Sequence, residues 1–198
     1  MHVHGIALLL WCLLLIVQPY LIRTKRNGLH KQVGKFSYLL VPIIAYSTVD
    51  LYKFRLRELT ALSTQDYLFT ASVLNALLTF LIFYGLAIYF RKSPAIHARY
   101  MVCTVFALFT AVIDRIIRFY FSFLLPYFPT VDGPVVQVVG LTLADILLVL
   151  LSIWDWRSHR KWNIFPIALG IHLLYHYSVL NFYKFEFWKS FSNWFFEL

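Results

Sequence analysis

Long apolar windows follow one another along the chain, separated by short polar segments. A helix crosses the hydrocarbon core of a membrane in roughly 20 residues, and windows of that length occur six times. The strand-like alternation of an outer-membrane barrel does not occur. The pattern therefore predicts an all-α polytopic membrane bundle, residues 1–198 forming a single transmembrane domain. We expect its six transmembrane helices near residues 4–22, 34–52, 66–90, 97–125, 135–154 and 162–183.

The C-terminal segment EFWKSFSNWFFEL has a different pattern. It is too short to cross the membrane, and its aromatic residues alternate with Lys189, Ser192 and Asn193. Such amphipathic segments lie in the headgroup region with the aromatic face toward the lipid. We expect an interfacial amphipathic helix over residues 186–198.

Composition agrees with a membrane location. Hydrophobic residues make up 61% of the chain and charged residues 14%, whereas charged residues account for about 25% of an ordinary soluble domain. The sequence also lacks a glycine-rich phosphate loop and a Gly-x-Ser-x-Gly nucleophile motif, so it does not resemble a soluble nucleotide enzyme or an α/β-hydrolase.

The net charge of +9 comes from basic residues that gather in alternate connections. The first, third and fifth connections hold most of the lysines and arginines, and the positive-inside rule makes these connections cytoplasmic. We therefore expect both termini outside. The basic loops are expected to contact anionic lipid headgroups, and nucleic acid is not expected as a partner.

Ionisable and polar side chains inside the spans are the candidates for a functional site, because such groups are costly in a bilayer and usually face the bundle interior. Counting residues from the span ends places most of them between the middle of the membrane and its outer surface. We therefore expect a ligand pocket in the outer half of the bundle. Its candidate residues are Asp145, Asp114, Arg118, Asn75, Tyr175 and Asp50. Asp145 has no basic neighbour on its own helix, so it must be protonated, paired with His172 or an arginine, or bound to a cation.

Three interpretations of this polar group remain open. In the first, His172 and His176 lie one turn apart on one helix face and bind one metal ion, with His4 and an aspartate completing the shell. A zinc ion with one position left to water would make the protein a membrane hydrolase.

In the second interpretation the protein carries haem b and transfers electrons. A haem in a helical bundle needs two axial histidines on facing helices. The cytoplasmic side offers His30 and His97, and on the outer side His4 would face His172 or His176.

In the third interpretation the polar pocket binds a small or lipid-like ligand, or the protein serves the assembly of other membrane proteins or of its own homo-oligomer. Asp114 and Arg118 then form an ion pair within one helix, and Asn75 forms a hydrogen bond between helices. This interpretation needs no special spacing and is the one we favour. The sequence leaves open whether the protein is an enzyme.

Two segments carry a resemblance to a family. LHKQVGKFSYLLVP contains His-x-x-x-Gly-Lys-x-Ser-Tyr, and PAIHARYMVCT contains His-x-Arg-Tyr-Met. In these motifs the chain resembles a group of bacterial multi-pass membrane proteins whose activity is uncharacterised. The resemblance implies a bacterial inner-membrane protein and implies no activity. Separately, the His-x-x-x-His of the last helix is similar to the zinc-binding pair of the adiponectin-receptor and alkaline-ceramidase superfamily, in which only His172 and His176 match.

Overall fold

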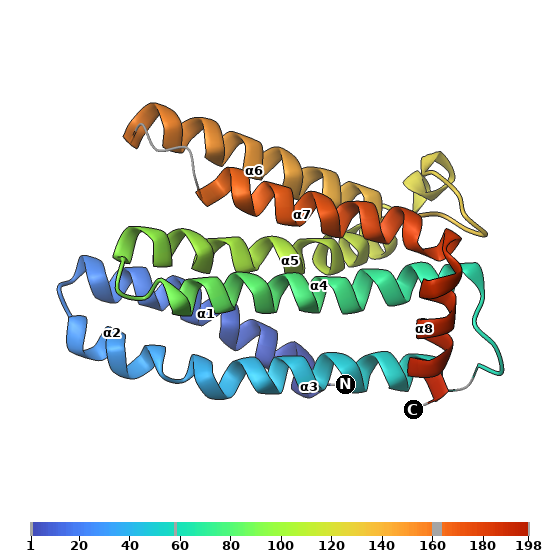
Figure 1. Ribbon diagram of the computed structural model, residues 1–198, viewed down its shortest axis with the longest axis horizontal. Coiled ribbons are helices and arrows are strands. Elements are labelled where there is room, and N and C mark those ends of the chain that lie inside the picture. Colours follow the sequence, from blue (N-terminus) through green and yellow to red (C-terminus); the bar gives the residue numbers. More distant parts are fainter. Residues whose placement is uncertain (1, 58, 160–163, 198) are drawn as a thin grey trace. The chain divides into compact units, whose positions relative to one another are not determined.

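The computed structural model describes residues 2–57, 59–159 and 164–197, and its described part is all-α (Figure 1). It contains eight α-helices and two short 3₁₀ helices. In chain order these are α1 (His2–Arg23), α2 (Asn27–Gly34), α3 (Ser37–Leu56), α4 (Thr64–Tyr89), α5 (Pro94–Tyr120), η1 (Ser122–Tyr127), α6 (Gln137–His159), α7 (Ile164–Asn181), η2 (Phe182–Lys184) and α8 (Glu186–Glu197).

Among the residues that the structure describes, five segments are long and apolar enough to cross a membrane. They are Val3–Arg23, Thr64–Tyr89, Pro94–Tyr120, Gln137–Ser158 and Ile164–Lys184. Large apolar side chains on them face outward, among them Ile16, Phe119 and Leu174, which are 69%, 79% and 71% exposed. A continuous outward apolar surface of this kind suits lipid rather than water. The chain is a multi-pass helical membrane protein.

One predicted span remains, the second in chain order, near residues 34–52. It corresponds to α3, which is a helix of 20 residues but is not among the five apolar segments. The lower apolar character of α3 has a simple origin. Ser47, Thr48 and Asp50 follow one another closely, and Lys53 and Arg55 occupy the last turn.

Two local features differ from the expected pattern. The predicted span 97–125 ends early, because α5 stops at Tyr120 and the 3₁₀ helix η1 follows. The 3₁₀ helix η1 contains Pro126, whose missing N–H and ring disfavour a regular α-helix through this turn. The first connection, expected to be a loop, contains the short helix α2, which ends at Gly34.

The chain divides into two compact units, Met1–Glu58 and Leu59–Leu198. In the first unit α1 packs against both α2 and α3. Its interior contains Trp11, Ile44 and Tyr52, whose side chains are buried.

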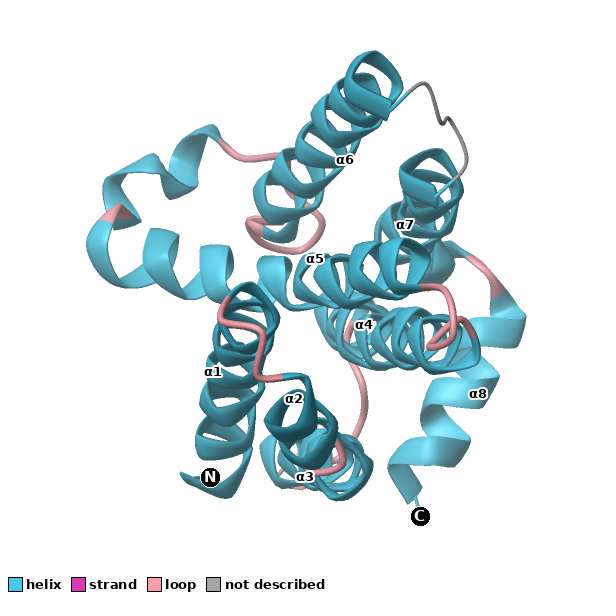
Figure 2. Ribbon diagram, turned by 90° about the vertical axis from the view of Figure 1, so that its left-hand side faces the viewer, coloured by secondary structure: helices cyan, strands magenta, loops and turns pink. Residues whose placement is uncertain are grey.

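In the second unit α5 packs against α4, α6 and α7, and α7 also packs against α4 and α6 (Figure 2). Two buried apolar clusters fill the space between these helices. One includes Phe83, Cys103 and Leu148, and the other includes Leu68, Leu141 and Val179. A polar layer that lies between these two clusters is described below.

The predicted helix over residues 186–198 is present as α8, which runs across the ends of α4 and α7 rather than along them (Figure 1). Two hydrogen bonds fix it to the start of α4. The indole Nε1 of Trp188 donates to the Tyr67 carbonyl at 3.1 Å, and the Tyr67 hydroxyl donates to Asn193 Oδ1 at 3.1 Å. The start of α4 is itself stabilised by a capping box between Ser63 and Asp66.

Candidate functional site: a carboxylate shared by two histidines

Asp145 on α6 contacts two histidines on α7. Its Oδ1 lies 2.6 Å from Nδ1 of His172, and its Oδ2 lies 2.6 Å from Nδ1 of His176. His172 and His176 lie one helical turn apart, so both rings leave the same face of α7. One carboxylate on α6 can therefore accept a hydrogen bond from each ring. We call these three residues the Asp–His–His cluster.

The cluster lies between the two apolar clusters of the second unit. Ala144 and Leu148 on α6, with Ala168 on α7, belong to one of them. Leu141 on α6 and Val179 on α7 belong to the other. Asp145 is eight residues, or roughly 12 Å, along α6 from its start at Gln137. The charged group is therefore well inside the span.

Burial differs among the three side chains. His172 is fully buried, whereas the side chains of Asp145 and His176 are 14% and 19% exposed. Nε2 of His172 is a buried atom with no hydrogen-bond partner among the described residues. The accessible edge of the cluster is formed by His176 and one side of the Asp145 carboxylate.

The hydrogen bonds restrict the protonation states. An ionised carboxylate only accepts hydrogen bonds, so Nδ1 of each imidazole must carry a proton. The other ring nitrogen, Nε2, is buried in His172, whereas the His176 ring reaches the surface.

Tyr175 and Asn75, two of the predicted pocket residues, lie beside the cluster and connect α7 to α4. The Tyr175 ring meets the His172 ring edge-on at 5.4 Å, and its hydroxyl donates to the Ser72 carbonyl at 3.2 Å. Nδ2 of Asn75 donates to Oγ of Ser178 at 2.8 Å. These hydrogen bonds between helices hold α7 in register on α4.

Asp114 and Arg118 form the predicted ion pair along α5, with Nε of Arg118 at 3.0 Å from Oδ2 of Asp114. Their side chains are 24% and 41% exposed. No hydrogen bond or ion pair in the described part of the chain joins them to Asp145. Their arrangement is that of a solvated pair along one helix face.

Asp50 and His4 belong to the first unit. Together with Ser47 they line a small cavity of about 80 Å³, and Nδ1 of His4 lies 3.2 Å from Oγ of Ser47. The helix α7 belongs to the second unit. The expected participation of His4 and Asp50 in a site with α7 therefore stays a prediction.

The rings of His30 and His97, the haem candidates, both have hydrogen-bond partners: the Gln18 amide for His30 and a backbone carbonyl for His97. Nδ1 of His97 donates to the Ala87 carbonyl at 2.8 Å. The Gln18 amide, oriented by its neighbours, accepts from the Gly34 N–H at 2.8 Å and donates to the His30 carbonyl at 3.3 Å. His30 lies in the first unit and His97 in the second, so a haem between them also stays a prediction.

Within residues 2–57, 59–159 and 164–197, no group of three or more His, Cys, Asp or Glu side chains is arranged to hold a metal ion. In the Asp–His–His cluster the carboxylate faces the Nδ1 atoms, so it is a hydrogen-bond partner of the rings. Two imidazoles remain, which is one fewer than the three protein ligands of a catalytic zinc.

The sequence interpretation missed an ion pair between Arg99 on α5 and Asp155 on α6. Nε of Arg99 donates to Oδ2 of Asp155 at 2.9 Å, and Nη2 makes a second hydrogen bond to Oδ1. Asp155 is buried, at 3% exposed. Neither Arg99 nor Asp155 is among the candidate site residues of the sequence analysis. Their separation of 56 residues leaves no local signal for the pairing.

Comparisons with known proteins add no relative: no family model, no curated protein and no solved structure matches the chain.

Proposed function

We propose that this chain is a six-span protein of a bacterial inner membrane, with both termini outside. We further propose that its Asp–His–His cluster binds the hydroxyl group of a small or lipid-like ligand in the outer half of the bundle. The observation that carries the proposal is the carboxylate of Asp145 held by both histidines inside a span. A buried ionisable cluster is expensive in a membrane and usually serves a function.

The exposed edge of the cluster decides which ligand suits it. Nδ1 of His176 is committed to Asp145, so Nε2 is the atom that meets a ligand. It accepts a hydrogen bond when the ring is neutral and donates one when the ring is protonated. A hydroxyl both donates and accepts, and therefore fits either state.

Burial assigns the roles within the cluster. His172, which is fully buried, positions the carboxylate and does not touch the ligand. His176 and Asp145 meet the ligand at the partly exposed edge. Exposed apolar side chains one turn away on the same helices, Val149 on α6 and Leu173 on α7, suit a ligand with a hydrocarbon body.

The test is the identification of molecules that co-purify with the protein in mild detergent, by solvent extraction and mass spectrometry. The wild type should retain a hydroxyl-bearing compound at close to one per chain. His176→Phe and Asp145→Asn should each lower its amount about tenfold or more, as expected when a buried polar group loses its partner. Asp114→Asn, which changes an exposed ion pair on α5, should leave it unchanged.

Retention of the same compounds in equal amounts by all four proteins would overturn the proposal. If the wild type carries no such compound but purifies with a second membrane protein or as a stable oligomer, the assembly role would replace it.

Zinc binding is the second candidate, because one feature of the cluster favours it. Metal-bound histidines commonly donate their other ring nitrogen to a carboxylate, which orients the ring and increases its basicity. Asp145 does this for both His172 and His176. Elemental analysis of the purified protein separates the two candidates. About one zinc per chain, lost in His176→Phe, would support the metal site.

A further inference from the structure

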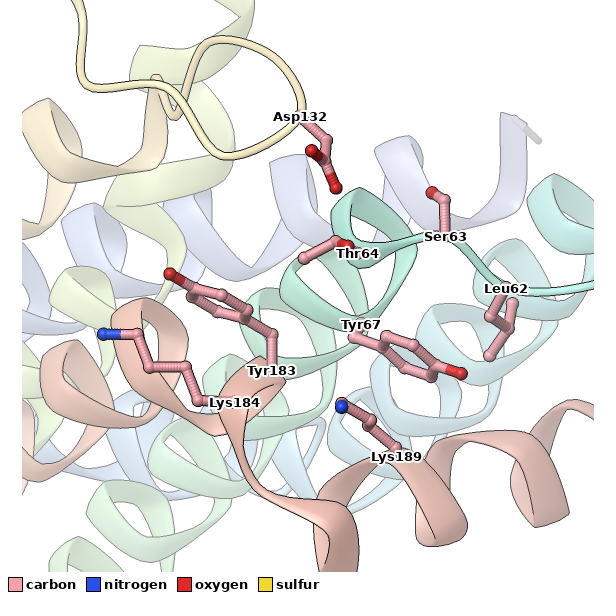
Figure 3. Close-up of a pocket in the computed structure, with 8 residues that line it drawn as sticks. All are labelled: Leu62, Ser63, Thr64, Tyr67, Asp132, Tyr183, Lys184 and Lys189. Carbon is pink, nitrogen blue, oxygen red and sulfur yellow. The ribbon is translucent and has the colours of Figure 1, made fainter.

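A second polar cavity, separate from the Asp–His–His cluster, opens at the end of the second unit (Figure 3). Its volume is about 630 Å³. The start of α4, the connection between η1 and α6, the short helix η2 and the first turn of α8 surround it. Its lining residues are Leu62, Ser63, Thr64, Tyr67, Asp132, Tyr183, Lys184 and Lys189. We call it the α4–α8 cavity.

The ends of two apolar segments place this cavity at the membrane boundary. Thr64 is the first residue of one candidate span and Lys184 is the last residue of another. The amphipathic helix α8 begins two residues later, at Glu186, and crosses the ends of α4 and α7 (Figure 1). Helices with such a pattern lie in the headgroup layer. The cavity therefore opens where phospholipid headgroups are found.

Residues of opposite charge line the α4–α8 cavity. Lys184 and Lys189 lie on the side of η2 and α8, with the Lys184 ammonium turned toward Asn181 on α7, and Asp132 reaches toward the first turn of α4 (Figure 3). Nζ of Lys189 is paired with Glu186 at 2.7 Å. Lys184 donates to the neutral amide oxygen of Asn181 at 3.1 Å, which does not cancel its charge. In the described part of the chain, neither Lys184 nor Asp132 forms an ion pair.

Hydrogen bonds to α4 fix the backbone on both sides of Asp132. Nε2 of Gln65, on the first turn of α4, donates to the carbonyl of Gly133 at 3.0 Å and to that of Val131. The backbone of Asp132 is left-handed, with φ of 51°, a conformation that Asp tolerates better than most residues. The turn is thus fastened to α4 on both sides of Asp132, and the carboxylate is held at the cavity.

We propose that the α4–α8 cavity binds the headgroup of a zwitterionic phospholipid that carries a primary amine. Lys184 exchanges its hydrogen bond to Asn181 for one to the phosphodiester, and the ammonium group of the lipid lies against Asp132. The same headgroup chemistry exists in a free phosphodiester, but the membrane-boundary position assigns the bilayer as its source. This site does not depend on the ligand of the Asp–His–His cluster.

Native mass spectrometry of the delipidated full chain in detergent tests the proposal. The probes are phosphatidylethanolamine, phosphatidylcholine, phosphatidylglycerol and free glycerophosphoethanolamine. Wild type should prefer phosphatidylethanolamine over the other two lipids. Lys184→Gln should weaken its binding about two- to fivefold, the size expected for a partly exposed ion pair. Asp132→Asn, which keeps the backbone tolerance of the position, should abolish the preference over phosphatidylcholine and phosphatidylglycerol.

Lys92→Gln is the matched control, since Lys92 is an exposed lysine in the connection between α4 and α5. It should bind all four probes as the wild type does. Equal binding of the three lipids by wild type, or a preference that survives in both Lys184→Gln and Asp132→Asn, would overturn the proposal. If glycerophosphoethanolamine binds as tightly as the intact lipid, the bilayer is not the source of the bound headgroup. Melting curves of each variant show whether a loss of binding reflects a loss of fold.

Discussion

Arg99 and Asp155 form a two-pronged ion pair between α5 and α6, with Nε of the arginine 2.9 Å from Oδ2 of the aspartate. The Arg99 side chain is 17% exposed and that of Asp155 is 4% exposed. Arg99 also donates to the Ala95 carbonyl one turn earlier on α5. The planar guanidinium can make all these contacts at once, which a lysine ammonium cannot do in the same geometry. The pair therefore fixes α5 against α6.

Replacing Arg99 should destabilise the protein more than replacing an exposed arginine. Arg99→Ala leaves the buried Asp155 carboxylate without its guanidinium and should lower the free energy of unfolding by about 3 kcal/mol. Arg99→Lys should recover only part of this loss. Arg118→Ala, which breaks the exposed pair on α5, should cost about 0.5 kcal/mol. SDS-induced unfolding in mixed micelles measures all three, and equal losses for Arg99→Ala and Arg118→Ala would contradict the assigned role.

A close approach of α5 and α6 depends on Gly140. A Cβ added there would lie 2.7 Å from Cα of Thr110 and 3.3 Å from its backbone nitrogen. Backbone cannot move aside as a flexible side chain can, so Gly140→Ala must push the two helices apart. We expect a loss of about 1 to 3 kcal/mol in the free energy of unfolding, the usual cost of overpacking.

Gly170 on α7 provides the matched control for Gly140. A Cβ at Gly170 would meet nothing within 4 Å. Gly170→Ala should therefore leave stability unchanged or raise it by up to about 1 kcal/mol, because alanine favours the helix. If both glycine variants melt at the same temperature, the close packing at Gly140 is not a stability determinant.

The effect of Asp145→Asn on stability separates the cluster from an ordinary exposed pair. The amide oxygen can still accept from one imidazole, but the amide NH₂ faces the Nδ1–H of the other ring. Either one hydrogen bond is lost or one ring must move its proton to Nε2. In the first case we expect a loss of about 1 to 3 kcal/mol. Asp114→Asn should cost only about 0.3 to 0.5 kcal/mol, and a melting comparison in detergent checks the difference.

The sequence predicted much of the fold because each span is decided locally, by a run of apolar residues long enough for the bilayer. Five of the six expected spans appear as long apolar helices, and the expected terminal helix appears as α8. The end of α5 at Tyr120 was missed because the aromatic residues that follow are as apolar as a span. Pro126 in η1 is a weak signal of the change, since α1 and α3 continue through Pro19 and Pro42.

The site was less predictable because its contacts join distant positions. Pairing with His172 was one of three states expected for Asp145, and the structure shows that pairing together with a second one to His176. Which residues of α6 face α7 depends on helix rotation, and apolar residues all around a span leave that rotation undetermined. Arg99 and Asp155 were missed for a related reason, since charges near span ends usually face headgroups or water.

Whether α3 crosses the membrane is the remaining difference between six spans and five. If it crosses, Thr24 after α1 and Thr60 after α3 lie on opposite sides of the membrane. We expect Thr60→Cys to react with a membrane-impermeant maleimide in intact spheroplasts, and Thr24→Cys to react only after the membrane is opened. Cys12 and Cys103, which are free thiols, would be replaced by alanine in both variants.

If both cysteines are labelled from the same side, α3 does not cross the membrane. That result would place the five apolar segments alone across the bilayer, and would put the two ends of the chain on opposite sides. The distribution of basic residues argues against it, because the basic connections after α4 and α6 would then lie on the side opposite to the basic connection that contains α2. When α3 crosses the membrane, its end lies at the opposite surface. The charged groups there, Asp50, Lys53 and Arg55, can reach water.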